Sequence, residues 1–557
     1  MHRTRFAVAF LLAALAAPGA AHAQDATDIL TGRVVDEFGQ PVSNAVVEVF
    51  SLMTEITRST LTDDDGKYVL LFPDGGGQYE MVVSGFGLAE TTLYVAREGV
   101  EEVLITQVTL AVEGVEVAGL DVSARRAPPG AGNAGTRAIN LPQRLLDRLP
   151  LPDLDPAMIA ALAPNVILTA GDTASDLASF SVAGQRDALN QVTLDGGSVT
   201  SVLGSQGGGL GLPEEGVRAT QVVTSTYDVS RGQFSGGLVS MTSARGVNRV
   251  TGSSSYYLQD PSLGSGNGAF VGGGTSQHRV SGGIGGPIRE NKLFYNVSFN
   301  AQRRADDLFA LIPENELDIL PLNANPDSIA RFLDILSNGY GVGLDGQTGQ
   351  FDRTGDGISL MGRMDFELTE RHSVLFRANG SVFEQDNAMI SPTELFQNGG
   401  TMGTDSYGAQ LGVTSRLGGA WINQFRTNLT GGGSDRSPYA IMPEGRVELG
   451  SQVGGPATGL GGVSGGRRGG AGGLGLSTLV FGGDGSMPSV SDERTLEVSD
   501  ELSFLLGFTH RLKVGALFKS TSFSQESGAN TLGRFTFPSL EALEQQAASS
   551  FSRSLAP

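Results

Sequence analysis

The sequence predicts a mainly β protein: an N-terminal β-sandwich, a mixed α+β domain, and the first part of a transmembrane antiparallel β-barrel. Three observations predict this class. An export signal opens the chain, and residues 24–112 place short apolar runs between turns rich in Gly, Pro and Asp. Beyond residue 250 the chain becomes a series of alternating segments of about ten residues, the pattern of strands that cross an outer membrane.

Residues 1–23 are predicted to be a signal peptide. A short basic region precedes a charge-free apolar run at residues 6–17. That run is shorter than the roughly 20 residues that a membrane-spanning helix needs. Ala21 and Ala23 then offer the small side chains that a signal peptidase reads, so we expect cleavage after Ala23.

The composition excludes several classes of function. The 557 residues contain no Cys, which removes thiol catalysis, Cys-zinc sites and iron–sulfur clusters. Gly accounts for 80 residues, about twice the usual share of roughly 7%, and without the three-residue period of collagen. The formal net charge of −21 argues against a nucleic acid partner.

Residues 24–112 resemble a known extension domain. The runs "GRVVDEFGQPVSNAVVEVF" and "TDDDGKYVLLFPDGGGQYEMVVSGFG" are similar to the carboxypeptidase regulatory-like domain, a β-sandwich that often precedes large outer-membrane receptors. The resemblance implies no peptidase activity. The Asp63–Asp65 run lacks the ligand spacing of a calcium loop and is explained by turn chemistry.

Residues 128–250 predict a small mixed sheet with short helical segments broken by Pro. Gln191–Leu194 is an alternating strand, Asp195-Gly196-Gly197 is a turn that accepts positive φ, and Arg218–Thr224 is a second strand. The elements "GQR", "NQVTLDG" and "YDVSRGQFSGG" resemble the plug domain of TonB-dependent outer-membrane receptors, in particular the Oar-like group. The turn candidates in this plug are Gly184, Gly196, Gly236 and Gly237.

The plug also carries a candidate charge network that would pair with the polar lining of the barrel. Such a network would hold the plug and still let it shift under a pull. The alternative is that these are ordinary solvated charges. The candidate residues are Arg186, Asp195, Arg218, Asp228 and Arg231.

Residues 113–127, "EGVEVAGLDVSARRA", lie between the extension and the plug, where the family has its TonB box. A periplasmic partner grips such a segment by adding a strand, so backbone hydrogen bonds and alternate side chains matter most. The alternative is a last sandwich strand followed by a linker. The box candidates are Val115, Glu116, Val117, Leu120 and Val122.

Residues 251–557 are predicted to be a partial transmembrane barrel. In Ile358–Leu368 the even positions are mostly apolar and the odd positions mostly polar, and the segment after the turn at Thr369–His372 repeats the design. Asp500 is an exception on the apolar face. "GGIGGPIRENKLFYNVSF" and "LMGRMDFELTERHSVLFRA" also resemble early barrel strands of Oar-like receptors. Since the family closes its barrel with about 22 strands, we expect this sequence to be an N-terminal fragment.

The sequence offers no candidate catalytic, metal or cofactor site. The Gly-rich stretch from Gly450 to Gly483 matches hydrolase and dinucleotide motifs by chance, because the strand and helix that those motifs require do not flank it. Three His remain after cleavage, and they lie far apart: His278, His372 and His510. We therefore expect a protein that is not an enzyme.

The resemblance implies an energised outer-membrane transporter. Its expected partners are the TonB–ExbB–ExbD complex, outer-membrane lipid and an extracellular substrate that the sequence does not identify. The alternative is a surface interaction or adhesion protein whose extension binds a glycan or a peptide. A secreted hydrolase is a third possibility, and no constellation of residues supports it.

Overall fold

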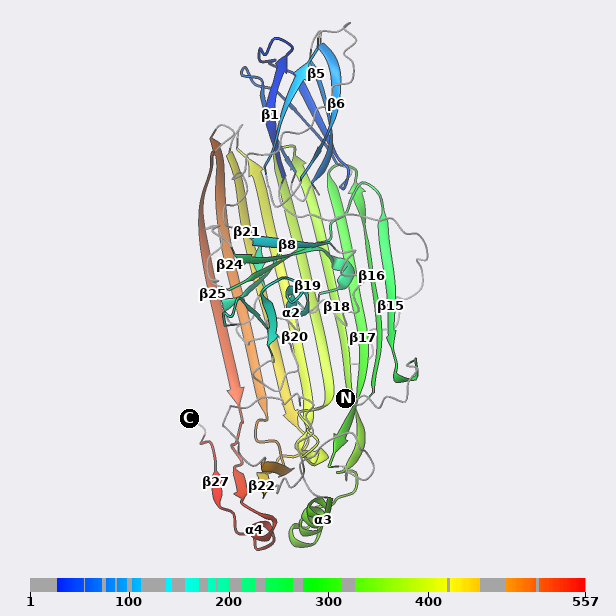
Figure 1. Cartoon of the computed structure of the whole chain (residues 1–557), viewed down its shortest axis with the longest axis vertical. Helices are drawn as coiled ribbons and strands as arrows, with labels where there is room; N and C mark the ends of the chain where they lie inside the picture. The colour runs from blue at the N-terminus through cyan, green and yellow to red at the C-terminus, as the bar shows by residue number, and fades with distance from the viewer. Residues whose placement is uncertain are drawn as a thin grey trace.

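The computed structural model describes residues 28–54, 56–72, 77–85, 88–97, 103–111, 137–142, 156–169, 179–186, 189–199, 212–225, 236–263, 274–311, 326–417, 421–450, 476–506 and 510–555. The fold is mainly β, as the sequence predicts (Figure 1). No helix in these ranges is long and apolar enough to cross a membrane.

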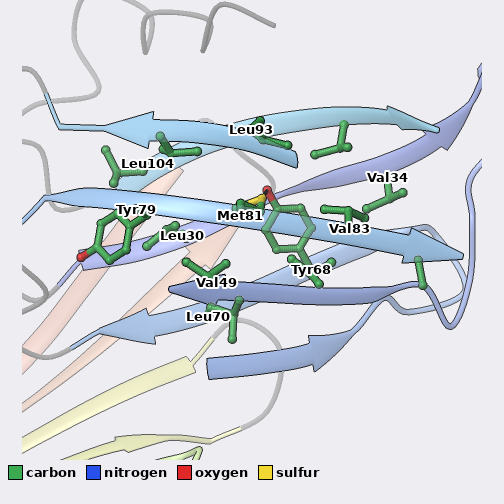
Figure 2. Close-up of a cluster of buried hydrophobic side chains, with 14 of the residues drawn as sticks. Leu30, Val34, Val49, Tyr68, Leu70, Tyr79, Met81, Val83, Leu93 and Leu104 are labelled. Atoms are coloured by element: carbon green, nitrogen blue, oxygen red, sulfur yellow. Dashed lines mark hydrogen bonds between the residues drawn. The ribbon is translucent and has the colours of Figure 1, made fainter. Parts of the chain in front are cut away.

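The N-terminal domain is a two-sheet β-sandwich. One sheet has the order β4-β1-β7, and the other has the order β3-β2-β5-β6. Figure 2 shows Tyr68, Tyr79, Met81 and their neighbours filling the space between the sheets. The strands are β1 (Asp28–Asp36), β2 (Val46–Ser51), β3 (Thr57–Leu61), β4 (Lys67–Phe72), β5 (Gln78–Gly85), β6 (Leu88–Ala96) and β7 (Val103–Leu110).

The second domain is a five-stranded mixed sheet of order β12-β11-β14-β13-β8, with a separate hairpin of β9 and β10. Its core combines Phe180, Val192, Leu194, Val239 and Met241. The elements are β8 (Arg137–Pro142), α2 (Pro156–Ala160), β9 (Val166–Thr169), β10 (Ser179–Val182), β11 (Gln191–Leu194), β12 (Gly197–Ser198), η2 (Glu214–Gly216), β13 (Val217–Ser225) and β14 (Leu238–Ser243).

A nine-stranded antiparallel sheet forms the largest part of the molecule and curves around the second domain (Figure 1). Its order is β15-β16-β17-β18-β19-β20-β21-β24-β25. The strands are β15 (Thr251–Gln259), β16 (Thr275–Arg289), β17 (Leu293–Ala310), β18 (Gly349–Thr369), β19 (His372–Ala388), β20 (Gly400–Arg416), β21 (Trp421–Pro438), β24 (Ser489–Leu506) and β25 (His510–Ser527).

The two faces of this sheet follow the predicted alternation. On β18, Ile358 and Leu360 are 45% and 54% exposed, whereas Arg363 is 2% exposed. A large apolar side chain that faces outward suits lipid, and a polar side chain on the opposite face suits a wet lumen. Asp500 lies on the lipid-facing side, where Asn423 Nδ2 donates to its Oδ1 over 2.7 Å. That bond gives the carboxylate a polar partner on the apolar face.

The two ends of the sheet differ. Short turns join β16 to β17, β18 to β19 and β20 to β21 at one end, where the sandwich lies (Figure 1). Long connections leave the other end. Because outer-membrane barrels have short periplasmic turns and long extracellular loops, the sandwich is on the periplasmic side.

The long connections fold into an extracellular cap with its own apolar core. The cap has a four-stranded sheet of order β23-β22-β26-β27, and its core includes Leu336, Leu395, Val447 and Leu543. Residues after Ser527 join this cap rather than the barrel. β22 ends at Gly450, where the Gly-rich stretch begins, and the last part of that stretch forms β23, which pairs with β22. The elements are α3 (Pro326–Asp334), η4 (Ile335–Gly339), η5 (Phe396–Asn398), β22 (Glu444–Gly450), β23 (Leu476–Gly482), β26 (Arg534–Phe537), α4 (Leu540–Glu544) and β27 (Ser550–Ser552).

Candidate functional site: the plug on the lumenal face of the barrel

A tight turn of the plug is the part that meets the barrel wall most closely. Asp195 and Gly196 join β11 to β12 with φ values of 48° and 81°. Positive φ at both central residues suits the right-handed twist of a two-residue hairpin, and Asp and Gly accept that geometry readily. The Asp195 N–H donates to the Met241 carbonyl over 2.9 Å, which fixes the turn to the plug sheet.

The Asp195 carboxylate joins the plug to two barrel strands. Within the plug it accepts from the Ser243 N–H over 2.9 Å and from the Ser243 hydroxyl over 2.8 Å. From the barrel, Arg377 of β19 donates to Oδ2, and Arg363 Nη1 of β18 lies 3.5 Å from Oδ1. One carboxylate is thus shared between its own domain and the wall.

The same turn continues along the next strands. Gln410 Nε2 of β20 donates to the Asp195 carbonyl over 2.9 Å, and Asn428 Nδ2 of β21 donates to the Ser198 carbonyl over 2.9 Å. The Ser198 N–H donates to Glu497 Oε1 of β24 over 3.4 Å. At Gly197 a Cβ would lie 2.7 Å from Asn428 Cγ, so any larger residue would displace the Asn428 side chain. The turn therefore bridges consecutive strands from β18 to β24.

Arg363 and Arg377 differ in how many carboxylates neutralise their charge. Arg363 also makes a bidentate contact with Asp365 on its own strand, at 2.8 and 3.0 Å. Arg377 is 0% exposed, and among the described residues Asp195 is the one carboxylate that pairs with it. A buried cation without its partner costs about 3–5 kcal/mol. The Asp195–Arg377 pair is therefore the contact most sensitive to separation of plug and wall.

A second contact lies on the first strands of the sheet. Glu214 of η2 lies 3.5 Å from Arg279 of β16. Glu215 Oε1 accepts from the hydroxyls of Ser255 and Ser281 over 2.9 and 2.7 Å. Like the turn at Asp195, this contact is made by polar groups, which can exchange with water when the surfaces part.

A third contact holds the end of the plug at the periplasmic rim. Arg245, just past β14, donates from Nη2 to Glu367 Oε1 of β18 over 2.8 Å. Its guanidinium also lies 5.4 Å from the centre of the Phe294 ring on β17. Both Arg245 and Glu367 are buried. A buried pair of this kind gains more from Coulomb attraction than an exposed pair does.

The predicted plug residues have different surroundings. Asp195 is at the centre of the wall contact. Arg186 is exposed and Arg218 is half-buried, and neither forms an ion pair with another described residue. Gly184 and Gly196 have positive φ, whereas Gly236 and Gly237 lie against Asn190 and Val182. Several predicted positions lie outside the described residues: Ala23, Val115, Glu116, Val117, Leu120, Val122, Asp228 and Arg231.

The sequence alone does not identify which residues meet in these contacts. Arg363 and Arg377 stand out only as charges on the polar face of an alternating strand, and Glu214 and Glu215 carry no local signal beyond their charge. The usable clue is a charged side chain within a lumen-facing series, because such a charge requires a partner. The pattern does not tell which plug residue supplies that partner.

The cap contains an acidic group whose pKa is shifted. The pKa of Glu394 is raised to about 7. Burial is the main cause, the hydrogen bonds from Ser391 lower the pKa, and the nearby Asp484 and Glu444 carboxylates raise it. Glu444 itself is paired with Arg446 and Arg534. Glu394 lies where the loop before β20 meets β23, through its bridge to Val480.

This shift predicts a pH dependence of the cap. Between the ordinary value of 4.5 and about 7, the unfolded cap would lose the Glu394 proton while the folded cap keeps it. Stability of the cap should therefore fall as pH rises through this window and level off above it. Protease cleavage of the cap on intact cells should be faster at pH 8 than at pH 5.5. Glu394→Gln should remove most of the difference, and an unchanged pH profile in that variant would contradict the assignment.

No group of three or more His, Cys, Asp or Glu side chains in the described part of the chain is arranged to hold a metal ion.

Two family models match the chain. Residues 29–126 match the carboxypeptidase regulatory-like domain, and residues 336–556 match an outer membrane beta barrel domain. A search of curated proteins by sequence finds no match.

Several solved outer-membrane proteins are similar in fold. The siderophore receptor PirA from Acinetobacter baumannii is 16% identical, with a TM-score of 0.45 over 71% of this chain and 49% of that one. The transporter YddB from Escherichia coli is 10% identical, with a TM-score of 0.46 over 72% and 50%. A ferric enterobactin receptor from Pseudomonas aeruginosa, in complex with enterobactin, is 14% identical, with a TM-score of 0.44 over 71% and 50%. The chain spans about half the length of these structures.

Proposed function

We propose that this outer-membrane β-barrel protein, with its N-terminal carboxypeptidase regulatory-like domain, is a TonB-dependent receptor that takes up a substrate through a plugged barrel. One observation carries the proposal. Among the described residues, the plug or the segment that leaves it contacts eight successive strands of the nine-stranded sheet, from β15 to β24, mainly through polar groups. A separate domain held in this way can be displaced without exposing a large apolar surface.

In this mechanism the protein acts as a gate and not as an enzyme. A substrate would bind at the extracellular cap and at the plug surface that faces it. The TonB–ExbB–ExbD complex would pull on the segment between the sandwich and the plug. The pull would separate Asp195 from Arg377 and Glu214 from Arg279, and a path along the polar wall would open.

The alternative of a surface adhesion protein predicts a binding module on the outside of the cell. The sandwich lies at the end with short turns, opposite the cap (Figure 1). A glycan- or peptide-binding role at the cell surface would therefore fall to the cap rather than to the sandwich. This placement favours a periplasmic role for the sandwich.

The experiment that tests the proposal is capture by the periplasmic domain of TonB. The intact protein in outer-membrane fractions should be captured, and a variant that lacks residues 115–122 should not. Strand addition needs backbone N–H groups, so Val117→Pro should weaken capture, whereas Val117→Thr should retain it. If the intact protein reaches the outer membrane and is never captured, an energised gate is the wrong function.

A further inference from the structure

One outer face of the sandwich is apolar as well as its core. On β1 and β4, Leu30 and Leu70 point into the core, while Ile29 and Leu71 point the other way. Those two outward side chains are nevertheless only 5% and 2% exposed. They pack against Ile422, at the periplasmic start of β21. A sheet that faced water on this side would have polar residues here, so the barrel rim covers this face.

Polar contacts surround this apolar patch. Arg58 of β3 places Nη2 2.5 Å from Glu367 Oε2, and its Nη1 donates to the Glu370 carbonyl over 3.1 Å. Arg416, at the end of β20, donates to the Val69 carbonyl of β4. The sandwich therefore docks on the turns β18–β19 and β20–β21 with both apolar and charged groups.

Glu367 is shared by the sandwich and the end of the plug. Its Oε2 faces Arg58 of the sandwich, and its Oε1 accepts from Arg245 over 2.8 Å. All three side chains are buried. Removing the sandwich would leave the rim side of the Arg245–Glu367 pair open to water.

We propose that the regulatory-like sandwich is a lid that docks on the periplasmic rim and keeps water away from the Arg245–Glu367 anchor of the plug. Two opposite charges attract each other strongly where water is excluded, and contribute little where they are exposed. Docking of the sandwich thus strengthens the hold of the barrel on the plug. Lifting the sandwich weakens that hold before any plug contact is broken.

The chain connectivity gives the lid a role in the proposed gate, and this step rests on the proposed function. The sandwich ends with β7 at Leu110, and the plug sheet begins with β8 at Arg137. A pull on the segment between them acts on both domains. A pull that lifts the sandwich would expose the Arg245–Glu367 pair to water and so ease the release of the plug.

The docking is tested with an engineered disulfide, which the absence of native Cys makes unambiguous. Leu71→Cys with Ile422→Cys should form an intramolecular disulfide when outer membranes are oxidised. Phe38→Cys with Ile422→Cys is the control. Phe38 is exposed in the turn that follows β1, and β1 extends about 23 Å from Ile29 to Asp36, so this pair should not form a disulfide. Equal crosslinking of both pairs, or of neither, would refute docking.

The lid effect is tested by hydrogen exchange in the single variants Arg58→Ala and Lys67→Ala. Lys67 is a matched control, since it is a cation of the same sandwich whose pair with Asp65 is exposed. Arg58→Ala should accelerate exchange over residues 238–246 by about fivefold or more, and Lys67→Ala should not change it. Unaltered barrel migration on unheated gels would show that both variants fold.

The outcomes separate the lid from the gate. If exchange over residues 238–246 in Arg58→Ala equals that of the unmodified protein, the sandwich is not a lid. TonB capture of Arg58→Ala should persist, because residues 115–122 are intact. If TonB does not capture the unmodified protein, the proposed gating function is wrong. The hydrogen-exchange result would still test whether the sandwich is a lid.

Discussion

Asp195→Ala should release the plug from the barrel wall. The substitution removes the carboxylate that pairs with Arg377 and lies beside Arg363, and it also removes two hydrogen bonds from Ser243. Arg377 is fully buried, and its Nε and Nη2 have no hydrogen-bond partner among the described residues. Leaving that cation without its anion should cost about 3–5 kcal/mol.

The measurement is hydrogen exchange over residues 189–199, together with the urea concentration at which a protease first cuts the plug. Both should show loss of protection in Asp195→Ala. Arg186→Ala is the matched control, because Arg186 is an exposed plug charge without an ion pair to another described residue. The double variant Asp195→Ala with Arg377→Ala should recover part of the loss, since it removes the uncompensated cation. Additive effects of the two substitutions would show that the pair does not hold the plug.

The sequence predicts the lumenal and lipid faces of the barrel well, because period-two alternation is a local property. It predicts β18 from Ile358, whereas the strand begins at Gly349. The missing part includes Asp352, Thr354 and Asp356, which lie on the outward side beyond the apolar band. The part of a strand that extends beyond the lipid need not be apolar on its outward face. The alternating pattern therefore ends before the hydrogen-bonded strand ends.

The contact between the plug and the barrel wall is predicted only in part by the sequence. The turn at Asp195-Gly196 can be predicted from the sequence, because only a few residue types adopt positive φ. The partner of Asp195 cannot be predicted, because Arg377 is 182 positions away in the sequence and any lumen-facing cation fits the same pattern. The sequence therefore predicts five candidates without ranking them: Arg186, Asp195, Arg218, Asp228 and Arg231. Among the described residues, the fold shows an ion pair with the wall for Asp195 and none for Arg186 or Arg218.

Both faces of β1 and β4 are buried, and the sequence of β4 indicates this. The run "KYVLLF" is nearly continuous in apolar residues, whereas a strand with one face in water should alternate. Such a run indicates that both faces are covered. The run does not indicate that the second cover is the rim of the barrel.

The cap could not be predicted, because its core is assembled from segments distant in sequence. Phe332 of α3 is fully buried there, and its ring lies 5.9 Å from that of Phe481, edge to face. Tyr340 and Phe537 also contact Phe481. Each segment alone is too short to bury its apolar side chains, so none carries a strong local signal.

Phe332→Ala should therefore unfold the cap and leave the barrel intact. Removing a buried Phe costs about 3–5 kcal/mol, which is a large share of the stability that a small domain has. Protease added to intact cells should cut the variant within residues 326–345, while barrel migration on unheated gels should not change. Arg331→Ala is the matched control. Arg331 is the neighbour of Phe332 on α3, its side chain is 43% exposed, and its pairs with Glu541 and Glu544 are exposed and contribute little.

The same pair of variants divides the proposed function into its two halves. If the cap binds substrate, Phe332→Ala should abolish uptake and retain capture by TonB, because the cap and the TonB-facing segment lie at opposite ends of the barrel. Arg331→Ala should retain both. If proteolysis shows that the cap of Phe332→Ala is unfolded and uptake nevertheless persists, the substrate is recognised by the plug and the barrel wall, beside the contact that Asp195 makes.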